Sequence, residues 1–221
     1  MKARGGVKAV NPAQLQAGIR LEISKKVRKS YAQTEVSIGD TARGMVRRHL
    51  LASGAVQSLL SGKLQSDFGL DSAGANRTVN QIIEYISNNI MVSFVSTPKS
   101  DSVATFTLDL LPMGVRGLAA LPAGQYTSTG KFGGGDVSWL TWLLTKGTQV
   151  VIGDFYVFDD PKGSSRAGSV MQKTGKNHPE GFRVDPGFSG TERDNFVTRA
   201  LAPIIPKIRN TIFQKIKEGL K

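Results

Sequence analysis

The stretch NFVTRALAPIIPKIRNTIFQKIKEGLK, residues 195–221, decides the fold of the C-terminal part of this 221-residue chain. Its apolar residues recur every three or four positions, which places them on one face of a helix, and its lysines and arginines occupy the other faces. Thr191 precedes Asp194 by three residues, so we expect their side chains to cap the helix there. Because Pro203 and Pro206 remove two amide donors, the sequence predicts a long basic helix with a kink or a restart near Pro206.

Two further basic helices are predicted before residue 60. Pro12 opens the first, in which apolar residues at four-residue spacing form one packing stripe: Leu15, Ile19, Ile23, Val27 and Tyr31. Asp40 is placed to cap a second, shorter helix that Gly54 ends. The cations of both helices are candidates for contact with a polyanion or an acidic partner, the alternative being simple solvent exposure. They are Lys25, Lys26, Arg28, Lys29, Arg43, Arg47 and Arg48.

The middle of the chain predicts one core helix followed by a β-hairpin. Residues 55–75 mix Gly, Ser, Asp and short apolar pieces, which is typical of a loop with one helical turn. Asn76 is placed to cap the core helix, whose apolar residues form a stripe that ends near Asn88-Asn89. Two β-like runs, 91–96 and 103–111, then fit an antiparallel hairpin.

Both tryptophans lie in a short helix predicted for residues 139–146, which Gly147 ends. Trp139 and Trp142 are three positions apart and therefore share a face. Buried tryptophans anchor cores, and tryptophan is also enriched at the centre of protein interfaces. The two side chains are accordingly either core anchors or contacts with another subunit.

These elements predict a mixed α+β fold, with helices packed around a small, mainly antiparallel sheet. One strand is expected at 149–158, and two short closing strands at 170–173 and 182–184. Residues 1–11 are basic and contain glycine, so we expect an extended N-terminal arm. Residues 12–221 are expected to form one domain, with a helical part at 12–90 and a β-rich part plus the C-terminal helix at 91–221.

The net charge of +12 is unevenly distributed. Residues 1–60 contain 11 basic and 3 acidic residues (+8), residues 61–160 contain 6 and 9 (−3), and residues 161–221 contain 12 and 5 (+7). Cationic side chains displace counterions from phosphate and gain affinity without reading base sequence. We therefore favour contact of the two basic ends with a polyanion over a surface that only aids solubility.

The residue types argue against an enzyme. The chain contains no cysteine, and its two histidines, His49 and His178, lie in unrelated contexts. No Gly-Lys-Ser/Thr follows the glycines at 133–135, and no Gly-x-Ser-x-Gly sequence occurs. The longest apolar runs are far shorter than the roughly 20 residues that cross a bilayer. We expect no catalytic residue, no metal, no cofactor and no membrane contact.

Residues 135–221 carry an order of short motifs that resembles a known family. A helix with sequence WLTWLL at 139–144 is followed by a strand, by SRAGSVM at 165–171, by FRV at 182–184 and by a helix that opens with NFVTRAL at 195–201. With the basic N-terminal helix and the small β-region, this order resembles the neck and tail-completion proteins of tailed bacteriophages. Residues 1–130 match only in general organisation.

The resemblance implies an α+β subunit of a ring at the junction of head and tail, around the channel through which double-stranded genomic DNA passes. The implied partners are copies of the chain itself, portal or adaptor proteins, tail proteins and the DNA. The implied location is the virion, after synthesis in the host cytoplasm.

Contacts between subunits are expected at Trp139, Trp142, Arg166 and Met171. The alternative for Arg166 is that its donors bind carbonyl groups of its own loop. A tail terminator in the same assembly, a free nucleic-acid-binding protein without sequence preference, and an enzyme with an unrecognised site are the alternative functions.

Overall fold

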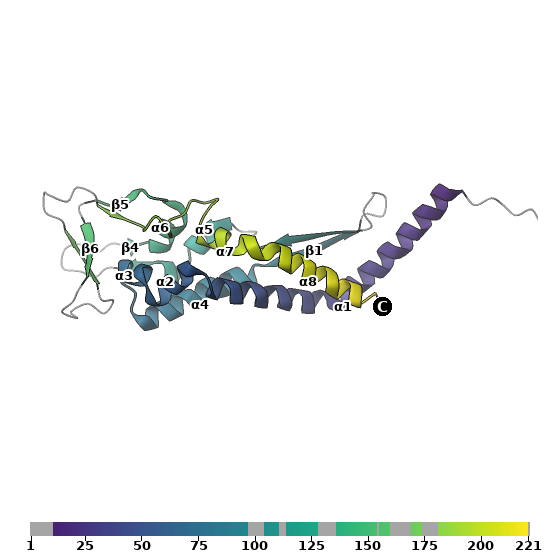
Figure 1. The fold of residues 1–221 in the computed structure, drawn as a ribbon, viewed down its shortest axis with the longest axis horizontal. Helices are drawn as coiled ribbons and strands as arrows, with labels where there is room; N and C mark the ends of the chain where they lie inside the picture. The colour runs from purple at the N-terminus through teal and green to yellow at the C-terminus, as the bar shows by residue number, and fades with distance from the viewer. Residues whose placement is uncertain are drawn as a thin grey trace, which may run out of the picture. The chain divides into compact units, whose positions relative to one another are not determined.

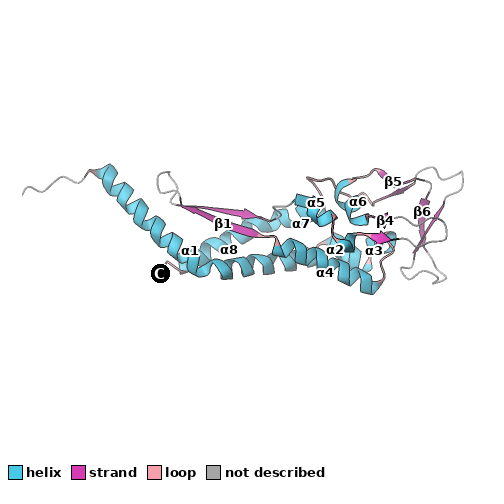
Figure 2. Ribbon diagram, turned by 180° about the vertical axis from the view of Figure 1, so that it is seen from behind, coloured by secondary structure: helices cyan, strands magenta, loops and turns pink. Residues whose placement is uncertain are grey.

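The computed structural model describes residues 11–96, 104–110, 114–127, 136–153, 155–159, 169–173 and 181–220, which form a mostly helical α+β fold (Figure 1, Figure 2). The contacts divide the chain into two compact units. The first comprises Met1–Thr41, Met91–Asp109 and Arg209–Lys221, and the second comprises Ala42–Ile90 and Leu110–Ile208. The predicted N-terminal arm lies outside the described residues, apart from Asn11.

The longest element is α1 (Pro12–Leu51), a helix of 40 residues. The predicted break at Asp40 is wrong, because the helix runs through this position without interruption. Ile38, Ala42, Val46 and Leu50 are all buried at four-residue spacing. This continuous packed face stabilises one helix where capping signals alone favoured two.

A β-hairpin packs on α1 in the first unit. Strands β1 (Met91–Ser96) and β2 (Ala104–Asp109) pair antiparallel, as predicted, with Phe94 opposite Phe106. The Tyr31 ring stacks on Phe94 with a centroid separation of 5.3 Å and lies 5.7 Å from Phe106. These three rings form the main aromatic cluster described in this unit.

Helix α8 (Ile205–Glu218) ends beside α1 (Figure 1). The Ser30 hydroxyl donates a 2.9 Å hydrogen bond to the carbonyl oxygen of Ile216, and the Lys215 ammonium donates one of 2.8 Å to the Ser37 hydroxyl. A Cβ atom added to Gly219 would collide with the Ser30 hydroxyl oxygen. The small residue at 219 therefore permits the close approach of the two helices.

The predicted interruption of the C-terminal helix is confirmed. Helix α7 (Phe196–Leu201) is followed by the 3-10 turn η2 (Ala202–Ile204) and then by α8, in which Pro206 is the second residue. The predicted cap is wrong, because Asn195 caps α7. Its side-chain oxygen accepts hydrogen bonds from the backbone amides of Val197 and Thr198, and its backbone N–H donates one to the Thr198 hydroxyl. Thr191 and Asp194 close the preceding turn instead.

The helices of the second unit begin earlier than the sequence predicts. The expected loop at 55–75 contains two short helices, α2 (Gly54–Ser61) and α3 (Lys63–Asp67). Helix α4 (Ser72–Asn88) starts four residues before Asn76, because the Asp71 carboxylate accepts a 2.5 Å hydrogen bond from the amide of Gly74. The predicted stripe of this helix is buried, as expected: Val79, Ile82, Ile83, Ile86 and the following Ile90.

The short helix with the tryptophans is confirmed as α6 (Trp139–Thr145). It follows α5 (Gly114–Ala119) and the 3-10 turn η1 (Pro122–Gly124). Gly147, just beyond the helix, has a φ of 57°, which suits glycine. A Cβ atom at Gly124 would lie 2.6 Å from that of Leu140, so η1 packs tightly against α6.

The single small sheet that the sequence predicts is replaced, in the described residues, by separate two-stranded antiparallel ladders. The prediction of one strand at 149–158 is also wrong. Two strands form, one on each side of Gly153, and they pair with different partners. Gly153 has no side chain to pack, which weakens a strand at this position. Strands form at both positions expected for the closing strands, 170–173 and 182–184, but they pair in separate ladders and so do not close one sheet. Besides the hairpin, the ladders join β3 (Tyr126–Thr127) to β4 (Asp136–Val137), β5 (Val150–Ile152) to β8 (Phe182–Arg183), and β6 (Phe155–Asp159) to β7 (Ser169–Lys173).

Candidate interaction surface on helix α1

Exposed large apolar side chains are concentrated in the first unit. Four of its described apolar residues are buried: Tyr31, Ile38, Ile212 and Ile216. Nine of the ten exposed large apolar side chains of the described chain also belong to it, namely Leu15, Ile19, Leu21, Ile23, Val36, Met91, Val95, Phe213 and Leu220. A unit with a small core and much exposed apolar surface is typical of a region that binds another protein.

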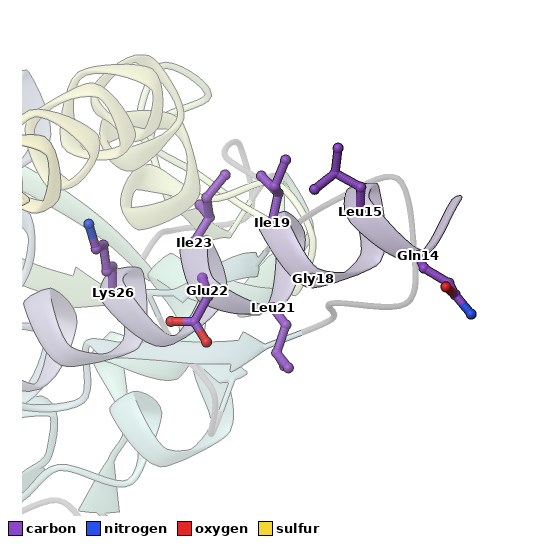
Figure 3. Close-up of a pocket in the computed structure, with 8 residues that line it drawn as sticks. All are labelled: Gln14, Leu15, Gly18, Ile19, Leu21, Glu22, Ile23 and Lys26. Atoms are coloured by element: carbon purple, nitrogen blue, oxygen red, sulfur yellow. The ribbon is translucent and has the colours of Figure 1, made fainter. Parts of the chain in front are cut away.

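The N-terminal end of the predicted α1 stripe is exposed. Tyr31, at one end of the stripe, is 7% exposed, whereas Ile23, Ile19 and Leu15 are 44%, 50% and 54% exposed. These three side chains point to the same side of the helix, and Leu21 points to the opposite side (Figure 3). An open hollow runs along this part of the helix and is lined by residues between 14 and 26. The stripe was expected to pack, but the described chain covers only its later part.

The three turns from Pro12 to Ile23 contain no residue that the described structure buries. Isolated helices of this length are marginal in water, because helical stability in proteins comes mostly from packing. Gly18 lowers the stability further, by about 1 kcal/mol relative to alanine. A Cβ atom at Gly18 would meet nothing within 4 Å, so the packing of this chain does not require the glycine.

Charge divides the exposed part of α1 into two surfaces. We call residues 12–23 the apolar segment; its only charges are Arg20 and Glu22, so its net charge is zero. We call residues 25–29 the cationic segment; it contains four cations and no acid. The four are Lys25, Lys26, Arg28 and Lys29, and all are exposed. A surface suited to protein contact is thus followed directly by one suited to a polyanion.

An ion pair joins the two segments. The Lys25 ammonium lies 2.7 Å from the Glu22 carboxylate, and both side chains are about two-thirds exposed, at 62% and 66%. This hydrogen bond, followed by the charge of Lys25, lowers the pKa of the Glu22 carboxyl from its ordinary value. Lys26 lowers it further. Glu22 is therefore ionised and partly offsets Lys25, which leaves Lys26, Arg28 and Lys29 to supply most of the positive charge of the segment.

The remaining predicted cations lie later on the same helix. Arg43, Arg47 and Arg48 are exposed, as a contact with a polyanion requires. Arg43 has an interaction with other groups of the chain. His49 is half-buried beside them, whereas His178 lies outside the described residues.

The predicted subunit contacts in the C-terminal half do not form one described surface. Trp139 is 1% exposed and packs on Phe68 at a ring separation of 4.8 Å, which makes it a core residue. Trp142 is half-buried, 6.1 Å from Phe182. Arg166 lies outside the described residues. Met171 belongs to β7, where its backbone pairs with Val157, and its side chain is outside the described part.

Sequence reasoning missed Leu21 and the division of α1 into two segments. Leu21 lies off the four-residue stripe, so a periodicity search does not select it. The available signal was the absence of net charge over residues 12–23 in a chain of net charge +12.

Other chemistry is not evident in the described part of the chain. Among those residues, no three His, Cys, Asp or Glu side chains gather where they could hold a metal ion. No helix there is long and apolar enough to span a bilayer. Comparison with known proteins finds no matching protein family, no matching curated protein and no matching solved structure.

Proposed function

We propose that this protein is a structural component of a tailed-phage virion, a neck or tail-completion subunit that forms a ring at the head-tail junction around the DNA channel. The observation that carries the proposal is the arrangement on α1, where an exposed apolar segment without net charge precedes an exposed cationic segment. A ring subunit around DNA needs both a surface for protein and positive charge for phosphate. The order of motifs in residues 135–221 adds support.

The proposal requires no catalytic group. Its partners are further copies of the chain, the portal or adaptor, tail proteins and double-stranded DNA. The excess of positive charge in both terminal regions of the sequence favours a cargo that carries dense negative charge and is held without reading base sequence.

The test uses a phage that encodes this chain. Mass spectrometry of purified particles should find the protein in a fixed number of copies, and labelled antibody should bind at the head-tail junction. Loss of the gene should give filled heads and separate tails. Particles that lack the protein, or heads and tails that join normally without it, would refute the proposal. A label that stays on the head-proximal end of tails that have not joined a head would favour a tail terminator instead.

A second function, a free nucleic-acid-binding protein without sequence preference, is favoured by the cationic segment alone. It predicts that affinity for duplex DNA of any sequence falls steeply with salt, with a slope of about −0.9 per phosphate neutralised. Lys26→Glu combined with Lys29→Glu should weaken the binding and flatten that slope. An affinity that does not change with salt would exclude this function.

A further inference from the structure

We propose that the apolar segment of α1, residues 12–23, binds a second copy of this chain, and that its two opposite faces meet two different neighbours. The inference deepens the proposed function, on which it rests for the biological role of the contact, and it names the surface through which copies meet.

The charge of the segment favours a copy of the same chain over an acidic partner or a polyanion. Arg20 and Glu22 give the segment a formal net charge of zero, although Glu22 pairs with Lys25, whereas residues 25–29 carry four cations. A polyanion or an acidic protein gains most from the cationic segment. Between residues 12 and 29, two copies of a strongly basic chain repel each other least at residues 12–23, where the net charge is zero.

The hairpin and α8 of this chain also present apolar surface similar to the one that covers the α1 stripe at Tyr31. Within one copy the stripe is covered at Tyr31 by Phe94 and Phe106 of the hairpin. The hairpin and α8 present further exposed apolar side chains, which no described residue covers: Met91, Val95, Phe213 and Leu220. A second copy therefore offers, in the same unit, the partner surface that Leu15, Ile19 and Ile23 lack.

The distribution of side chains around the helix indicates two unlike contacts. Leu15, Ile19 and Ile23 lie on one side and Leu21 on the other (Figure 3). A two-fold dimer uses one surface twice, so a dimer through the stripe would leave Leu21, which is 45% exposed, in contact with solvent. Contacts between unlike surfaces pass from copy to copy and close into a ring when the rotation permits.

The size of the segment implies that a single contact is weak. Three turns of helix are about 18 Å long and about 10 Å wide. One face is thus well below the roughly 800 Å² per partner of a stable interface. Pairs of free copies should dissociate readily, and a closed ring, in which each subunit makes two contacts, should be much more stable.

The first experiment measures self-association of the full chain by sedimentation velocity over a wide range of concentrations. The average mass of the wild type should rise above that of the monomer as concentration increases. Ile19→Glu combined with Ile23→Glu should weaken association at least about tenfold, because two carboxylates would have to leave water. The matched control is Val36→Glu, at a site on the same helix that is 77% exposed and outside the segment. It should associate as the wild type does.

The outcomes are distinct because all three positions are exposed and their substitution should leave circular dichroism and the unfolding midpoint unchanged. A wild type that stays monomeric at every concentration overturns the proposal. So does a double variant that associates like the wild type, or a control that fails to associate.

The second experiment tests by thiol crosslinking whether unlike surfaces of two copies meet, since the chain contains no cysteine. Ile19→Cys combined with Val95→Cys should give crosslinked species larger than a dimer, because the thiol on the stripe of one copy then meets the thiol on the hairpin of the next copy. Ile19→Cys alone should give at most a dimer with the same reagent. A double variant that also stops at the dimer overturns the contact between unlike surfaces.

Failure of this inference and failure of the proposed function can be told apart. A chain that associates through residues 12–23 but is missing from virions keeps the contact and loses the function. A virion component that does not associate through these residues keeps the function and loses the contact.

Discussion

The phenolic oxygen of Tyr31 lies 2.9 Å from the backbone carbonyl oxygen of Val92 and donates a hydrogen bond to it. This bond joins helix α1 to the first strand of the hairpin, 61 residues later in the chain. The same ring stacks on Phe94, so one side chain supplies both the apolar and the polar part of the contact.

Tyr31→Phe should lower the free energy of unfolding by about 1 to 2 kcal/mol, because the ring stays and the Val92 carbonyl loses its donor in a partly buried site. Denaturant unfolding followed by circular dichroism measures the change. Tyr85→Phe is the matched control, since the Tyr85 hydroxyl makes no hydrogen bond within the described part of the chain. Equal effects of the two substitutions would contradict the role assigned to the bond.

Tyr31 should also make stability depend on pH in the alkaline range. Burial raises the pKa of its phenol above 10.0, and the charge of Glu35 raises it further. The folded state therefore favours the neutral phenol, so the contribution is complete below pH 10 and is lost as the pH rises through the raised pKa. The stability difference between wild type and Tyr31→Phe should be constant up to about pH 10 and shrink above it. A difference that grows above this pH would show that the pKa of Tyr31 is lowered and not raised in the folded state.

Gly219→Ala should destabilise the contact between α8 and α1 by about 1 kcal/mol, because the new methyl group displaces the Ser30 hydroxyl and breaks its bond to Ile216. The cost should be smaller when Ser30→Ala is also present, and a double-mutant cycle measures the difference. Gly18→Ala is the control. It has free space around the new methyl group and should raise helix stability by up to about 1 kcal/mol. Additive effects at 219 and 30 would show that the two residues do not interact.

Asn195→Ala should lower the free energy of unfolding by about 1 to 2 kcal/mol, because the amides of Val197 and Thr198 lose their acceptor at the start of α7. Thr191→Ala should cost less, since the Thr191 hydroxyl accepts one bond, from the amide of Asp194, in the exposed turn before the helix. Thermal unfolding of both variants decides between the two capping sites. A larger effect at Thr191 would support the cap by Thr191 and Asp194 that the sequence pattern predicts.

Local patterns predicted the elements that are packed on one face. The stripe from Val79 to Ile86, the hairpin and the helix that begins at Trp139 all follow from spacing that matches burial. The restart near Pro206 follows from the missing amide donors of proline. Each of these signals lies within about ten residues of the element that it specifies.

Features that depend on distant contacts could not be predicted in this way. An acceptor at Asp40 resembles a helix start, but burial of Ile38 and Ala42 on either side keeps α1 continuous. Gly153 separates two strands whose partners come later in the chain. The spacing of Leu15, Ile19 and Ile23 specifies an apolar stripe, yet spacing does not say whether the same molecule covers it.

The exposed start of α1 has a practical consequence for anyone who purifies this protein. Proteases attack helical turns that lack tertiary support, and a cut before Ser24 would leave the Tyr31–Val92 and Ser30–Ile216 hydrogen bonds in place. Such a shortened product would show a normal melting curve while having lost residues 12–23. Intact mass should therefore be verified in every preparation before a negative assembly result is accepted.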